Sequence, residues 1–454
     1  MHEVYLNWAK SEARERDTTM RMRYNSAMER TERIRKPEVA PAPDSPLIEK
    51  WRAGMKLDNT VEWARDDEDI FTGLKAGETF DGPLFIQYPN EEAHGYIGLR
   101  RKHQRTFSLP RVDAESPFHY YTMKGTGFVE DLKHKLWERM PEDLDKNYYG
   151  LYDLSSAKWD RRYSLKLMKI GVRIVEPVAI LRLHELPTYA GGRVPIEELR
   201  EKKPPAPGKI SDSLEALRHE LASQPKSNEL REMFTPVVYL RKARSDTRID
   251  DITERVNFGM NPDFKEVVKA ELQNVMRDVG KELGRSLTPL EYIEWFAITC
   301  GENVGRMHRH GLLHRYLHPG NITLAAELVD FDSMTHIKDV PHDDSQATLF
   351  NFRDAKRLAH AREIERDTKG VDDDIVDGVQ KICLNLAATV AECFPDALPE
   401  YAQKKDGFDQ YLFEELFPYI DGSLWGAYLR EQEHSRAVVK SFNMPKGDEK
   451  PKRE

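Results

Sequence analysis

The chain has 454 residues and a formal net charge of −9; 39% of its residues are hydrophobic and 32% are charged. A chain of this length accommodates two or three folded units with tails. Its net acidity excludes the coating of nucleic acid as a main task, because neutralising phosphates requires a basic face. The mean hydropathy of −0.69 indicates that much of the chain is surface, linker or solvated helix.

Cysteine usage and hydropathy together predict the compartment. The cysteines Cys300, Cys383 and Cys393 show no CxxC or Cys/His zinc spacing, so neither a disulfide framework nor a structural zinc site is expected. No run of about eighteen apolar residues occurs, and the first residues lack the apolar segment of a signal peptide. We therefore expect a soluble cytoplasmic protein that has no membrane partner.

The first part of the chain is predicted to contain strands. Residues 1–50 combine an Arg- and Glu-rich stretch with the proline-rich KPEVAPAPDSP, which predicts a charged arm and linker. Within residues 51–250 the segments PLFIQY, GYIGL and VRIVEPVAILRL predict strands with a helix between them, and Val237–Leu240 predicts a further strand. Prolines near residues 201–209 (EKKPPAPGK) predict a surface insertion.

Residues 251–442 are predicted to be mainly helical. Thr288, Pro289 and Glu291 form a capping-box signature for a helix that runs to about His308. Two apolar stripes at helical spacing predict core-facing helix surfaces: Leu290, Ile293, Phe296, Cys300, Val304 and Met307, then Cys383, Leu386, Ala387, Val390 and Phe394. With a disordered tail over residues 443–454, the predicted fold class is α+β in two lobes.

One segment, HGLLHRYLHPGNITLAAELVDFDSM over residues 310–334, carries candidate chemistry. Two short apolar runs, Ile322–Leu324 and Glu327–Val329, predict strands joined by a turn. Such a hairpin would place the Asn321 amide oxygen beside the Asp330 carboxylate. These are oxygen ligands of the kind that Mg²⁺ or Mn²⁺ takes alongside nucleotide phosphates.

The same segment resembles the catalytic and metal-binding loops of the protein-kinase-like superfamily. His314–Asn321 keeps the frame of His-Arg-Asp-Leu-Lys-Pro-x-Asn, and Asp330–Asp332 stands in the Asp-Phe-Gly place. The resemblance implies a two-lobed kinase-like fold with a mixed strand/helix N-lobe and a mainly helical C-lobe. Tyr316 replaces the catalytic aspartate, and a tyrosine with an unperturbed pKa of about 10 accepts a proton poorly at neutral pH. Ordinary phosphoryl transfer is therefore disfavoured.

Two other interpretations apply to this segment. It can be a loop between helices whose histidines satisfy local backbone groups. His310 and His314, four residues apart, also suggest a zinc protease, but Gly311 stands where that motif needs a catalytic Glu, and no third zinc ligand suggests itself.

Three separated segments extend the resemblance across roughly residues 115–335. Tyr121–Gly127 (YTMKGTG), the stretch WDRRYSLKLMKIGVRIVEPVAIL, and Val237–Arg248 (VVYLRKARSDTR) follow one another in the chain. In this order they resemble selenoprotein O, a family of pseudokinases whose members transfer AMP to protein hydroxyls.

The resemblance implies roles for particular residues. Lys124 stands for the nucleotide-binding lysine, and Asp160 for the acid that pairs with it. Arg241 and Arg248 stand for the arginines that hold the phosphates of a reversed ATP. Guanidinium groups and divalent ions suit a pyrophosphate leaving group. The alternative for both arginines is a salt-bridged strand end.

The sequence departs from the family at the proton acceptor. Family members usually carry an Asp immediately before the metal-binding Asn, where this chain has Gly320. Asp332 is the carboxylate that could replace it, so the candidate catalytic residues are Asp330, Asn321 and Asp332.

Three functions follow from these residues. The first is transfer of AMP from ATP to a protein hydroxyl or another acceptor, with Mg²⁺ or Mn²⁺. The second is a small-molecule phosphotransferase of the aminoglycoside or choline kinase type. The segments Leu317–Asn321 and Asp330–Asp332 also resemble the loops of that family. The third is an inactive nucleotide-binding scaffold. In each case the expected partner is a nucleotide, with a protein or small-molecule acceptor in the first two and no nucleic acid.

Overall fold

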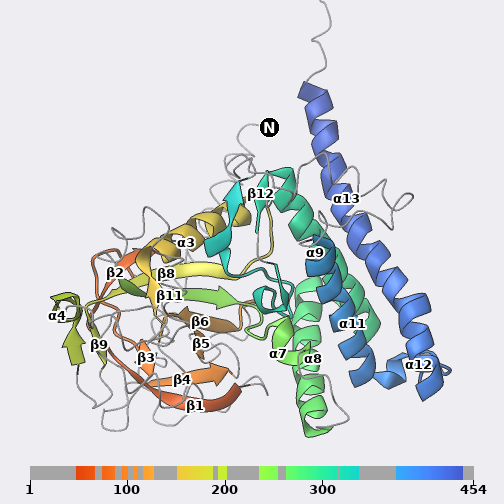
Figure 1. The fold of residues 1–454 in the computed structure, drawn as a ribbon, viewed down its shortest axis with the longest axis horizontal. Helices are drawn as coiled ribbons and strands as arrows, with labels where there is room; N and C mark the ends of the chain where they lie inside the picture. Colours follow the sequence, from red (N-terminus) through yellow and green to blue (C-terminus); the bar gives the residue numbers. More distant parts are fainter. Residues whose placement is uncertain are drawn as a thin grey trace, which may run out of the picture. The chain divides into compact units, whose positions relative to one another are not determined.

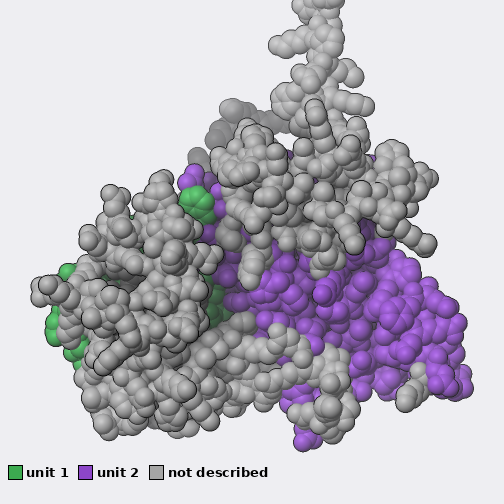
Figure 2. All heavy atoms as spheres, in the orientation of Figure 1, with its two compact units in different colours: residues 1–161, 176–246 green, residues 162–175, 247–454 purple. Residues whose placement is uncertain are grey.

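The computed structural model divides the chain into two compact units. Unit 1 comprises residues 1–161 and 176–246, and unit 2 comprises residues 162–175 and 247–454 (Figure 2). The described residues are 48–66, 74–86, 95–100, 106–109, 116–126, 151–187, 193–201, 235–253, 262–314, 317–336 and 375–442. Tyr316, Gly127 and most of the predicted arm, insertion and tail lie outside these ranges.

The described residues of unit 1 form an antiparallel sheet of nine strands in the order β2-β8-β11-β6-β5-β4-β1-β3, with β7 also paired to β11 (Figure 1). Its strands are β1 Ile48–Met55, β2 Asn59–Ala64, β3 Phe85–Ile86, β4 Gly95–Arg100, β5 Thr106–Leu109, β6 Tyr120–Lys124, β7 Tyr152–Asp153, β8 Glu176–Leu183 and β11 Pro236–Ala243. β9 Glu185–Pro187 pairs with β10 Arg193–Pro195, and α4 Ile196–Glu201 follows. The predicted strands in PLFIQY, GYIGL, VRIVEPVAILRL and Val237–Leu240 are confirmed in β3, β4, β8 and β11.

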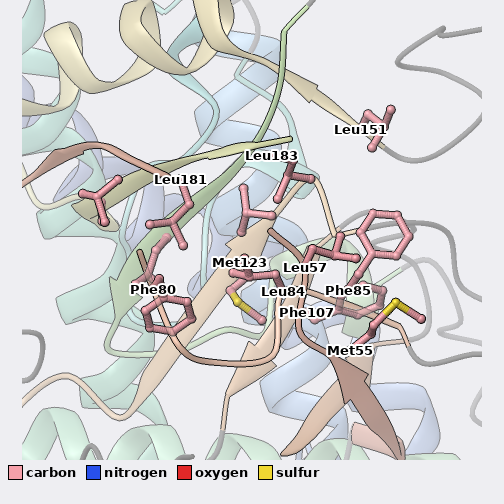
Figure 3. Close-up of a cluster of buried hydrophobic side chains, with 14 of the residues drawn as sticks. Met55, Leu57, Phe80, Leu84, Phe85, Phe107, Met123, Leu151, Leu181 and Leu183 are labelled. Carbon is pink, nitrogen blue, oxygen red and sulfur yellow. The ribbon is translucent and has the colours of Figure 1, made fainter. Parts of the chain in front are cut away.

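Alternation along β11 separates two apolar layers. Successive side chains of a strand point to opposite faces of the sheet. Val238 and Leu240 belong to the larger core cluster with Met123 (Figure 3). Val237 and Tyr239 belong to a second cluster, which includes Ala157 of helix α3 Leu154–Lys169. All eight residues of β11 are buried, the polar ones included.

Helices dominate unit 2 (Figure 1). They are α7 Ile249–Thr253, α8 Pro262–Leu283, α9 Pro289–Arg309, α11 Lys381–Cys393, α12 Lys405–Tyr411 and α13 Phe417–Phe442. Shorter turns are η3 Pro319–Asn321, η4 Phe331–Ser333, η6 Ile375–Gln380, η7 Pro395–Ala397 and η8 Leu412–Leu416, and strand β12 Leu312–Leu313 pairs with β13 Thr335–His336. None of the helices in the described ranges is both long and apolar enough to cross a membrane.

The predicted apolar stripes face the core of unit 2. Ile293, Phe296, Cys300, Val304 and Met307 are buried on α9, with Leu290 half-buried. On and just after α11 the buried residues are Cys383, Leu386, Ala387 and Val390, with Phe394 half-buried. Cys300, Cys383 and Cys393 are free thiols and all three are buried.

The predicted capping box starts α9. The Thr288 hydroxyl accepts the Glu291 N–H at 3.3 Å, and the Glu291 carboxylate accepts the Thr288 N–H at 2.8 Å. Hydrogen bonds from the Thr288 backbone and hydroxyl, and one from Arg285, lower the pKa of Glu291 to about 2. Because this pKa lies below the ordinary value of 4.5, the stabilisation is fully present above pH 4.5 and is lost as pH falls toward 2.

Thr288→Ala is expected to destabilise unit 2 by about 1 kcal/mol at pH 7, because the Glu291 N–H loses its side-chain acceptor at the helix start. The difference in unfolding free energy between the variant and the wild type should shrink as pH falls from 4.5 toward 2. Urea denaturation at several pH values measures both effects. Thr288→Ser keeps the hydroxyl and should retain most of the stability; a loss equal to that of the alanine variant would exclude the cap as the cause.

Candidate functional site

A tight hairpin carries Asn321 and Asp330. Asn321 ends the turn η3 and is 2% exposed, and its carbonyl accepts the Val329 N–H at 3.0 Å. An antiparallel bridge joins Ile322 to Leu328, so the two predicted strands are reduced to a single bridge around the predicted turn. Since Asp330 follows Val329 directly, the hairpin brings Asp330 and Asn321 to neighbouring positions on its two arms.

The hairpin sequence closes its own turn. The Thr323 N–H donates to the Glu327 carbonyl at 2.9 Å, and the Thr323 hydroxyl donates to the Glu327 carboxylate at 3.1 Å. In return, the Glu327 N–H donates to the Thr323 hydroxyl at 3.2 Å. Ala326 completes the turn with φ of 55°. Glu327 is fully buried, so these bonds satisfy polar groups that have no water around them.

Two other segments of unit 2 hold the hairpin by backbone hydrogen bonds. The Ile249 N–H donates to the Ile322 carbonyl at 3.0 Å, next to a bridge between Arg248 and Thr323. On the other arm, the Val175 N–H donates to the Leu328 carbonyl at 3.1 Å. Four segments thus form a miniature sheet, which fixes the position of the hairpin within unit 2.

Asp330 has a strained backbone. Its φ of 68° and ψ of 61° are left-handed, and Ala326 is the other non-glycine residue with positive φ in the described ranges. A left-handed aspartate is uncommon, and such strain gathers at functional sites. Asp332, on η4, is exposed. The strain at Asp330 therefore agrees with a ligand-binding role for its carboxylate, while the catalytic role of Asp332 stays a prediction.

His314 links the two loops of the motif. It is buried, its Nε2–H donates to the Val329 carbonyl at 2.9 Å, and its ring lies edge-on to Phe331 with centroids 5.5 Å apart. Burial lowers the pKa of His314, so the ring is neutral at pH 7. Sequence reasoning placed His314 in the kinase frame but missed this contact. The Nδ1 of His318 also bonds to a backbone group, the Gly320 N–H at 3.1 Å, as the plain-loop interpretation expects.

The zinc-protease interpretation stays excluded. Helix α9 ends at Arg309, His310 is its C-cap, and His314 follows strand β12. The two histidines therefore do not share a helix face.

Arg248 contacts the backbone beside Asn321. Its Nη1 donates to the Gly320 carbonyl at 2.6 Å, and both residues belong to unit 2. The contact holds the turn η3. A phosphate-binding role for Arg248 stays a prediction.

In unit 1, Lys124 and Arg241 lie on the same face of the sheet. Lys124 pairs with Tyr239 across β6 and β11, and Arg241 pairs with Thr122. Directly opposed residues share a face, and so do residues two apart on one strand. Both cations lie on the α3 side with Tyr239.

Two stacked tyrosines connect Lys124 with Asp160. The Lys124 ammonium lies 4.1 Å from the centroid of the Tyr152 ring, which stacks on Tyr239 at 6.2 Å. The Tyr239 hydroxyl donates to the Asp160 carboxylate at 3.4 Å. Lys124 and Asp160 are 3% and 1% exposed, so both charges are buried around one tyrosine pair. Sequence reasoning found the two charged residues but not the tyrosines between them.

Arg241 is buried without an ion pair among the described residues. It is 3% exposed, its guanidinium carbon lies 5.7 Å from the Tyr239 centroid, and its Nε has no hydrogen-bond partner in the described ranges. A buried cation left in this state is unfavourable unless an anion neutralises it. Its surroundings therefore fit an anionic ligand such as a phosphate.

The metal-ligand candidates of unit 2 are few. No group of three or more His, Cys, Asp or Glu side chains in the described ranges could hold a metal ion. Asn321 and Asp330 offer one amide and one carboxylate, a set that suits Mg²⁺ bound together with substrate phosphates and not by protein alone. The pair therefore fits a divalent ion that arrives with a nucleotide.

Comparisons with known proteins identify no family. No protein-family model matches the chain, and no curated protein matches it. The chain is similar to the solved kinase domain of a rhoptry antigen from Toxoplasma gondii at 10% identity, covering 74% of this chain and 84% of that one, with a TM-score of 0.27. A rhoptry kinase from the same organism is 9% identical, with coverages of 79% and 84% and a TM-score of 0.23. TM-scores this low do not establish a shared fold.

Proposed function

We propose that the protein is a metal-dependent nucleotidyltransferase that transfers AMP from ATP to a hydroxyl group, as the resemblance to selenoprotein O implies. The observation that carries the proposal is the buried Arg241, whose Nε has no partner in the described ranges, on the same sheet face as Lys124. Two buried cations on one face suit a polyphosphate better than a neutral ligand.

Each unit carries candidate residues of its own. In unit 1, Lys124 and Arg241 bind the phosphates, and Asp160 orients Lys124 through the tyrosine pair. In unit 2, Asn321 and Asp330 would hold a divalent ion, whose positive charge would offset phosphate charge, and Arg248 fixes the turn beside them. The acceptor oxygen bonds to the α-phosphorus, and the bond from that phosphorus to the bridging oxygen breaks. Pyrophosphate leaves with the bonding electron pair.

Labelled ATP tests the reaction. The wild-type protein, incubated with Mg²⁺ or Mn²⁺ and candidate acceptors, should incorporate label from the α-phosphate and none from the γ-phosphate. Incorporation from the γ-phosphate alone would reject the proposal and favour the small-molecule phosphotransferase. Thermal stabilisation by ATP without any transfer would favour the nucleotide-binding scaffold, because a ligand that binds only the folded state must stabilise it.

Arg241→Lys is expected to weaken Mg-ATP binding about 10- to 100-fold, since lysine keeps the charge but loses the planar fork that binds phosphate oxygens. Isothermal titration calorimetry measures the change. Arg182→Lys is the control, because Arg182 also lies on a strand of the sheet but its side chain is 40% exposed and its Nη2 already pairs with Glu62 at 2.5 Å. If both variants lost Mg-ATP affinity equally, Arg241 would not be a phosphate-binding residue.

A further inference from the structure

The space beside Gly320 is filled by a carboxylate from another element. A Cβ added at Gly320 would lie 2.8 Å from Asp250 Oδ2 and 2.7 Å from His318 Cε1. Real Cβ atoms essentially never show contacts this short, so residue 320 has to be glycine while Asp250 and His318 keep these positions. The Asp250 carboxylate thus lies against the position where a side chain of residue 320 would begin, one residue before Asn321.

Backbone contacts on both sides of Asp250 hold it there. Asp250 lies in the first turn of α7, between Ile249, whose N–H donates to the Ile322 carbonyl at 3.0 Å, and Asp251. The Asp251 carboxylate accepts the Arg248 N–H at 2.8 Å, and Arg248 Nη1 donates to the Gly320 carbonyl at 2.6 Å. All of these residues belong to unit 2, so the juxtaposition is a property of one unit.

The proposed reaction needs a proton acceptor. Among the described acids of the two loops, Asp330 is assigned to the metal and Asp332 is exposed on η4. His318 has its Nδ1 engaged by the Gly320 N–H. Asp250 is half-buried and lies against the residue that precedes Asn321. A carboxylate so placed can accept a proton from a hydroxyl group at neutral pH.

We propose that the Asp250 carboxylate is the general base that accepts the proton of the acceptor hydroxyl, a role that rests on the proposed nucleotidyl transfer. As the hydroxyl oxygen bonds to the α-phosphorus, its O–H bond breaks and the proton passes to an Asp250 oxygen. Pyrophosphate leaves with the electron pair of the broken P–O bond. The carboxylate comes from α7, and the glycine at position 320 makes room for it.

Asp250→Asn tests the base with little change of shape. It should lower kcat for α-label transfer about 10²- to 10⁴-fold, the usual contribution of general-base catalysis. The KM for ATP and the thermal stabilisation by Mg-ATP should stay near the wild-type values. Asp263→Asn, an exposed acid in the first turn of α8, is the control and should retain activity.

A carboxylate exchange sharpens the test. Asp250→Ala should lose activity, and Asp250→Ala combined with Gly320→Asp should recover at least about tenfold, because the alanine removes the Asp250 contact and a small shift of the His318 ring removes the other one. The inference is overturned if Asp250→Asn keeps the wild-type kcat, if it loses Mg-ATP stabilisation together with kcat, or if Asp332→Asn alone abolishes transfer. These outcomes leave nucleotidyl transfer standing, whereas a wild-type protein without α-label transfer would reject that function itself.

Discussion

Asp330→Asn is expected to lower the rate of α-label transfer about 10²- to 10⁴-fold, because the negative ligand of the divalent ion is lost and several kcal/mol of charge stabilisation go with it. The substitution changes the charge of the side chain and leaves the backbone conformation as it is. Asparagine tolerates the left-handed backbone of residue 330 nearly as well as aspartate does, so φ of 68° adds little new strain. Activity measured across a Mg²⁺ and Mn²⁺ titration, with thermal unfolding alongside, checks the result.

The control for this variant is Asp396→Asn, an exposed acid in the short turn η7, which should retain activity. The unfolding temperature without ligand should be similar in both variants. If Asp330→Asn kept both its activity and its metal-dependent stabilisation by ATP, the Asn321–Asp330 hairpin would lose its assignment as the metal site.

Gly125→Ala is expected to destabilise unit 1 by about 2–5 kcal/mol, the sum of a left-handed backbone and an overpacked contact. Gly125 has φ of 98°, and an added Cβ would lie 2.4 Å from the Val237 carbonyl and 2.9 Å from Tyr152 Cβ. The carbonyl belongs to the central strand β11, so it cannot move without disturbing the sheet. The midpoint of urea unfolding measures the change.

Gly77→Ala separates the cost of the left-handed backbone from the cost of the overpacked contact. Gly77 has a similar φ of 90°, but nothing lies within 4 Å of an added Cβ. It should therefore lose only the backbone contribution, about 1–2 kcal/mol. Equal destabilisation at the two glycines would show that the approach to β11 contributes nothing.

The sequence predicted those elements whose formation depends on interactions between residues close together in the chain. The period of the apolar stripe located α9, and Thr288 with Glu291 marked its first turn. The short apolar run at Val237–Leu240 predicted β11, because four consecutive apolar residues are the length and composition of a buried strand. The turn between Asn321 and Asp330 was predicted for the same reason: its closing groups lie within a few residues of one another.

Contacts between distant segments could not be predicted in this way. Asp250 reaches Gly320 across 70 residues, and nothing near either residue in the sequence marks the pair. The Arg248 contact with the Gly320 carbonyl is equally remote. The resemblance assigned charges to Lys124, Asp160 and Arg241, but the Tyr152–Tyr239 stack around which they gather depends on strand pairing. A motif gives the identity of a site residue, while its neighbours come from the fold.

The placement of the cysteines provides a built-in reporter of local opening. All three thiols of the chain lie in unit 2 and are buried, and burial raises the pKa of Cys300 and, to about 12, that of Cys393. Because alkylating reagents attack the thiolate, labelling requires the surrounding helices to separate first. The kinetics of modification by a small maleimide therefore report how often the helices around these thiols open.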